Sequence, residues 1–72
     1  MPLQWATTQN NLGTALWRLG ERESGTARLN EAVAAYSEAL KEFTREAAPR
    51  WHDIAQQNIT QCLALLERRR RQ

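Results

Sequence analysis

Apolar residues recur every three or four positions in three stretches of this chain, and short polar stretches with glycine or proline separate them. This spacing is typical of amphipathic helices, which turn one apolar stripe toward a core. The pattern predicts helices at about residues 3–19, 26–44 and 49–69. Because the links are short, sequential helices should pack antiparallel. We therefore expect an all-α fold, in which a third helix packs on a two-helix hairpin.

The first predicted helix carries a single apolar stripe with i, i+3, i+4, i+7 spacing. Its members are Leu12, Ala15, Leu16 and Leu19, with Trp5 two turns earlier. We expect this stripe to pack inside the molecule. Gly20 follows the last apolar position, and glycine often ends a helix because it tolerates a left-handed conformation. The helix should therefore stop at Gly20.

The second and third predicted helices have longer stripes. In the second, the apolar positions are Leu29, Ala32, Val33, Tyr36, Ala39, Leu40 and Phe43. In the third, they are Trp51, Ile54, Ala55, Cys62, Leu65 and Leu66, broadened by Ile59 and Leu63. Ser24 or Thr26 could cap the second helix. The residue before a proline avoids the helical region, so Ala48 should end any helical run before Pro49.

The stretch from Gln9 to Leu16 returns in altered form from Gln56 to Leu63, at an offset of 47 residues. The same offset aligns Pro2 with Pro49. An internal repeat of this length indicates a repeated helical unit. The third helix is then a second copy of the first.

These residues resemble the tetratricopeptide repeat (TPR) family over about residues 3–66. The matching positions, which the resemblance implies are packing positions, are Leu12, Gly13, Leu16, Ala32, Tyr36 and Ala39. Glycine inside a helix costs about 1 kcal/mol relative to alanine, so Gly13 favours a close approach of the second helix. The 47-residue repeat is longer than the usual ~34 and resembles the kinesin-light-chain variety. Since Thr60 replaces the glycine in the second copy, the third helix resembles a terminal cap.

The resemblance implies that the first helix and its second copy line a groove for an extended peptide. The implied groove residues are Asn10, Asn11, Thr14, Arg18, Gln57, Asn58 and Gln61. Asparagine and glutamine amides both donate and accept hydrogen bonds, which suits a peptide backbone. Two readings stay open for Asn11 and Asn58: they bind peptide groups, or they hydrogen-bond between helices.

Charge is uneven along the chain. The net charge is +2, but Arg68–Arg71 supplies four positive charges, so residues 1–67 are net acidic. Clustered arginines can neutralise phosphates, and a nucleic-acid-binding helical bundle is therefore the alternative function. However, no aromatic residues are interleaved, and arginines at a helix C-terminus also complement its dipole. We expect a solvated basic tail over residues 68–72.

Candidate chemistry is sparse. His52 and Cys62 stand ten residues apart on one predicted helix, about 15 Å along its axis, and cannot form a dyad. We expect no catalytic site, metal or cofactor.

The single cysteine is typical of a reducing compartment, and no apolar run is long enough to span a membrane, so we expect a cytoplasmic protein.

One and a half repeats leave helix faces uncovered, because each repeat buries its face on a neighbour. The expected function is therefore protein–protein interaction, with a protein or peptide partner and with self-association. Exchange of a helix across residues 44–49 is one route to a dimer.

Overall fold

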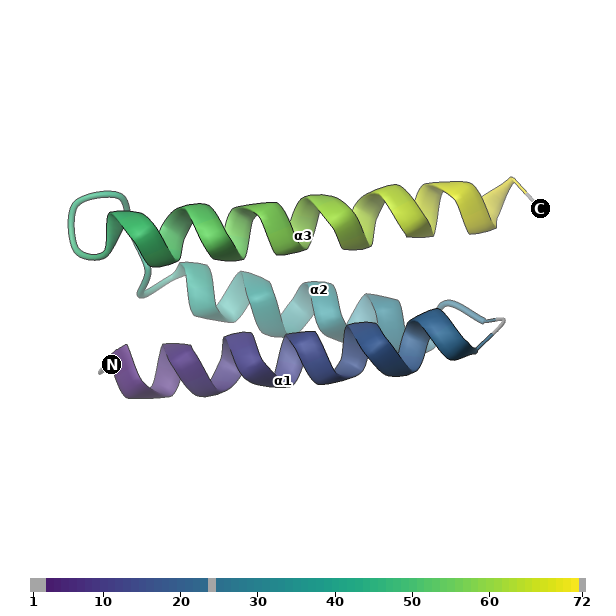
Figure 1. Ribbon diagram of the computed structural model, residues 1–72, viewed down its shortest axis with the longest axis horizontal. Helices are drawn as coiled ribbons and strands as arrows, with labels where there is room; N and C mark the ends of the chain where they lie inside the picture. Colours follow the sequence, from purple (N-terminus) through teal and green to yellow (C-terminus); the bar gives the residue numbers. More distant parts are fainter. Residues whose placement is uncertain (1–2, 24, 72) are drawn as a thin grey trace.

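The computed structural model describes residues 3–23 and 25–71, and within them it contains three helices and no strand (Figure 1). The helices are α1 (Leu3–Arg22), α2 (Ala27–Leu40) and α3 (Pro49–Arg70). The all-α prediction is confirmed. Thr26 stands at the N-cap of α2 without a side-chain capping bond, whereas Ser24 and Gln72 lie outside the described residues.

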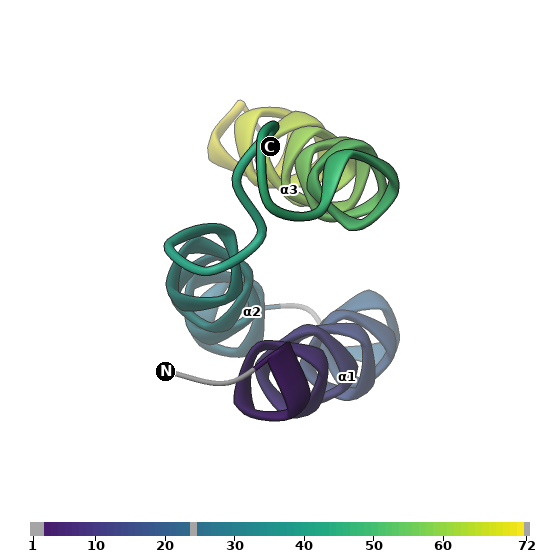
Figure 2. The same cartoon turned by 90° about the vertical axis from the view of Figure 1, so that its left-hand side faces the viewer.

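The middle helix, α2, holds the other two together. It runs antiparallel to both, so α1 and α3 point in the same direction (Figure 1). Viewed from the end, the three helices form an arc in which α2 touches both partners, whereas α1 and α3 meet along few positions (Figure 2). The molecule is therefore elongated, with extents of 39 × 17 × 13 Å.

Two glycines lie on the face of α1 that packs on α2. An added Cβ on Gly13 would lie 2.7 Å from the Tyr36 ring, and one on Gly20 would lie 2.6 Å from Leu29 Cδ2. Gly13 therefore permits the close approach of the rigid Tyr36 ring, and Gly20 leaves room for the Leu29 side chain. The prediction that Gly20 ends the helix is wrong, because α1 continues to Arg22 and none of the described glycines has a positive φ.

The predicted burial of the leucine stripe on α1 is also wrong. Leu12 is 47% exposed and Leu19 is 48% exposed, Ala15 is exposed, and Leu16 is half-buried. The narrow face with the two glycines lets α2 approach more closely than a leucine face would, so α1 turns that face inward. Among residues 4–22 of α1, for which the structure describes burial, the buried positions are Ala6, Asn10, Gly13 and Gly20.

The stripe of α2 is buried or half-buried throughout, as its spacing predicts. Ala32 and Ala39 are fully buried and Tyr36 nearly so. The helix ends at Leu40, four residues earlier than predicted, because the chain turns there and directs Phe43 into the core. In this linker Thr44 Oγ1 accepts a hydrogen bond from the Ala47 N–H at 3.1 Å, and the Phe43 ring stacks on Trp51 at 5.4 Å.

One stripe of α3 packs on α2. Its buried members are Ala55, Ile59, Cys62 and Leu66. Ile59 and Cys62 share a core cluster with Ala32 and Tyr36. The flanking residues Trp51, Ile54 and Leu63 are exposed, so the buried face is narrower than predicted.

Candidate functional site

The side of α1 that faces away from α3 presents an exposed row of residues, which we call the outer face. Its members are Thr8, Leu12, Ala15 and Leu19. At 100° per residue, Leu12 lies roughly 160° around the helix from Asn10, which contacts α3. Two nearly half-exposed leucines on one side of such a small protein form a candidate binding surface.

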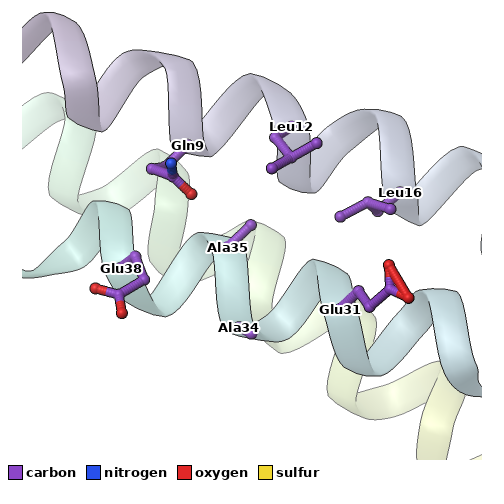
Figure 3. Close-up of a pocket in the computed structure, with 7 residues that line it drawn as sticks. All are labelled: Gln9, Leu12, Leu16, Glu31, Ala34, Ala35 and Glu38. Atoms are coloured by element: carbon purple, nitrogen blue, oxygen red, sulfur yellow. The ribbon is translucent and has the colours of Figure 1, made fainter.

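A shallow groove adjoins the outer face, between α1 and α2 (Figure 3). Leu12 and Leu16 line it from α1, and Ala34 and Ala35 line it from α2. The small alanine side chains leave the space open, and Gln9, Glu31 and Glu38 add polar groups at its edges. Its apolar walls with few polar groups suit a protein side chain.

The structure places the predicted groove asparagines differently from one another. Asn10 is only 6% exposed, and Asn58 Nδ2 donates to Asn10 Oδ1 at 3.4 Å. For Asn58, the interhelical reading therefore has a partner in the structure, although that partner is Asn10 and not Asn11. Asn11 is exposed. Asn10 is not open to a peptide, because its amide lies between α1 and α3.

Thr14 also makes internal contacts. Its Oγ1 donates to the Asn10 carbonyl at 3.1 Å and lies 2.9 Å from the Tyr36 hydroxyl. Burial raises the pKa of Tyr36, and the hydrogen bond with Thr14 opposes this rise. The remaining predicted groove residues, Arg18, Gln57 and Gln61, are exposed.

Arg69 has a structural role that the sequence did not reveal. Its Nη1 donates to the carbonyls of Gly20 and Gly25, each at 2.7 Å, and its Nη2 donates to the Glu21 carbonyl at 3.2 Å. Carbonyls in the last turn of a helix lack helical partners, and a cation there complements the helix dipole. The prediction of a solvated tail is therefore wrong for Arg69, which ties α3 to the α1–α2 loop. The sequence signal for this role was the arginine run near the C-terminal end of the third predicted helix, which antiparallel packing of sequential helices would place beside the C-terminal end of the first.

The other arginines of the run stay in solvent. Arg68, Arg70 and Arg71 are exposed, and Glu67 lies 3.9 Å from Arg70 and 3.4 Å from Arg71. The described run belongs to the last turn of α3 and to the residue after it.

The predicted burial of Cys62 is confirmed, since its side chain is fully buried. Burial raises the pKa of this thiol from 9.0 to about 11, and the negative charge of Glu21 adds to the rise. The thiol is therefore poorly nucleophilic at neutral pH.

His52 lies near Asp53, at 3.5 Å between Nδ1 and Oδ1. No group of three or more histidine, cysteine or acidic residues in the described part of the chain could hold a metal ion.

None of the helices, as far as the structure describes them, is long and apolar enough to cross a membrane. No protein-family model matches the sequence, and comparison with curated proteins and with solved structures finds no significant match.

Proposed function

We propose that this protein is a protein-interaction module that binds its partners through the outer face of α1 and the adjoining groove. The observation that carries the proposal is the exposure of Leu12 and Leu19 on one side of α1. Fully burying a leucine side chain gains about 1.5–3 kcal/mol. The core does not use these leucines, and a partner that covers them supplies the missing burial.

The TPR resemblance belongs to the same proposal. The contact of Gly13 with Tyr36 and the burial of Ala32 and Ala39 support it, because these are the positions where the resemblance implies close helix packing. In such arrays each unit covers a face of the next. The exposed apolar face along the outer side of α1 fits this kind of assembly.

The two other candidate functions have less support. An extended-peptide site would lose Asn10, which is buried and paired with Asn58. Nucleic-acid binding would lose one of its four clustered arginines, because Arg69 donates to backbone carbonyls. We therefore place the binding function on the outer face of α1.

Sedimentation velocity over a dilution series tests the proposal. In the isolated chain we expect weak, reversible self-association, because the outer faces of two copies can cover each other. The double variant Leu12→Ser/Leu19→Ser should sediment as a monomer with unchanged helix content. The matched control is Ile54→Ser/Leu63→Ser, which removes exposed apolar residues from α3 and should associate like the wild type. A wild type that stays monomeric up to the highest concentrations, or an α1 variant that associates like the wild type, would contradict the proposal.

A further inference from the structure

The 47-residue repeat lets the two copies of the helix be compared position by position. The four buried positions of α3 are Ala55, Ile59, Cys62 and Leu66. Their counterparts 47 residues earlier are Thr8, Leu12, Ala15 and Leu19, and all four are exposed. Three of these counterparts are apolar and similar in size to the buried residues. The outer face of α1 therefore repeats the face that α3 uses to dock on α2.

The polar contacts beside that face are repeated as well. Asn58 and Arg69 link α3 to α1 and to the α1–α2 loop. Their counterparts at the same offset are Asn11 and Arg22, and both are exposed. Hence α1 carries the apolar stripe, the asparagine and the arginine of a docking helix.

Comparing the inward face of α1 with the corresponding face of α3 gives a different result. The inward face of α1, which packs on the rest of the molecule, comprises Ala6, Asn10, Gly13, Trp17 and Gly20. Its counterparts in α3 are Asp53, Gln57, Thr60, Ala64 and Glu67, and all five are exposed. These residues are mostly polar, and they lack the glycines that admit Tyr36 and Leu29. The two helices therefore differ: the face of α3 that corresponds to the inward face of α1 is mostly polar, whereas α1 keeps an exposed copy of the apolar stripe that α3 buries.

We infer that the outer face of α1 docks on a helical hairpin of the same kind as α1–α2, in the way that α3 docks on this chain's own hairpin. This inference rests on the proposed function and names the partner. The partner presents a face with the small and aromatic side chains of Ala32 and Tyr36. It also offers loop carbonyls to Arg22, as the α1–α2 loop offers them to Arg69.

The hairpin of a second copy of this chain is not open for such docking. Its site is filled by its own α3, which the short linker of residues 41–48 keeps close. A tethered helix has a high effective concentration and outcompetes a free one. The partner hairpin is therefore one that lacks its own third helix.

A tandem chain tests this inference. In this tandem chain, residues 1–47 form the first unit and are followed directly by all 72 residues as the second unit. Pro2 of the second unit then stands where Pro49 stands in the single chain. The helix of the second unit that corresponds to α1 is then available as the third helix of the first hairpin. Ala15 is the counterpart of the buried Cys62, which makes position 15 a suitable place for a thiol reporter. In a Cys62→Ala background, Ala15→Cys is introduced into either the first or the second unit, and the rate of thiol labelling is measured.

We expect the thiol in the second unit to label at least about tenfold more slowly than the thiol in the first unit, the factor that about nine-tenths occupancy of a docked form gives. The slowing should be independent of protein concentration, and Leu12→Ser/Leu19→Ser in the second unit should abolish it. If the thiols in the two units are labelled at equal rates, the inference is overturned, and this holds whether or not the first hairpin is folded. So would slowing that survives the leucine substitutions. If equal rates occur while the single chain still associates through Leu12 and Leu19, the proposed function stands and the hairpin partner is wrong.

Discussion

At the scale of single residues, the two helical glycines fix how α1 sits on α2. A Cβ added to Gly13 would lie 2.7 Å from the Tyr36 ring, and one added to Gly20 would lie 2.6 Å from Leu29 Cδ2, so either addition would force a neighbour to move. The sequence revealed the role of Gly13, because glycine inside a helix is costly unless something packs against it. It misled at Gly20, because a glycine that follows the last apolar residue also fits a helix end. Only the three-dimensional position of Leu29 separates the two roles.

Gly13→Ala should destabilise the protein. The new Cβ would lie 2.7 Å from Tyr36 Cδ1, and such overpacking costs about 1–3 kcal/mol. The better helix propensity of alanine returns about 1 kcal/mol, so we expect a net loss of about 1 kcal/mol, seen as a Tm lower by about 4–8 °C. Gly25→Ala is the control, because its added Cβ meets nothing within 4 Å, and it should leave Tm equal or slightly higher. Equal effects of the two substitutions would refute the close-approach role of Gly13.

At the scale of elements, α3 is held by an apolar stripe along its length and by Arg69 at its C-terminal end. The stripe was readable from the sequence, apart from its exact width. The role of Arg69 was not, because four successive arginines look alike until the α1–α2 loop is placed beside one of them. Periodicity within a helix reports its faces, but it does not report which loop lies next to its end.

Arg69→Ala should loosen the C-terminal end of α3. It removes charged hydrogen bonds to the carbonyls of Gly20, Glu21 and Gly25, and losing bonds of this kind costs about 1.5–3 kcal/mol. Arg70→Ala removes the same charge from a side chain that is 72% exposed and should change stability by less than about 0.5 kcal/mol. Urea denaturation measures both. If the two variants lose the same stability, Arg69 acts only through its charge.

At the scale of the whole molecule, the sequence predicted the number of helices, their order and the buried stripe of α2. It did not predict which of two possible faces of α1 turns inward. The leucine stripe suggested one face and the glycines another, and the close fit with Tyr36 and Leu29 decided for the glycines. The leucines of the outer face then had to be exposed. The candidate site thus emerged where the helix pattern and the observed packing disagree.

The most direct measurement of the central claim, that the outer face of α1 is a docking face for a helical hairpin, is urea denaturation of the tandem chain. The slope of the unfolding free energy against denaturant is proportional to the surface exposed on unfolding. If the second unit's outer face docks on the first hairpin, the tandem chain should unfold in one transition that is steeper than that of the single chain and has a higher midpoint. A midpoint and slope equal to those of the single chain would mean that the first hairpin gains nothing from that face, and would contradict the claim.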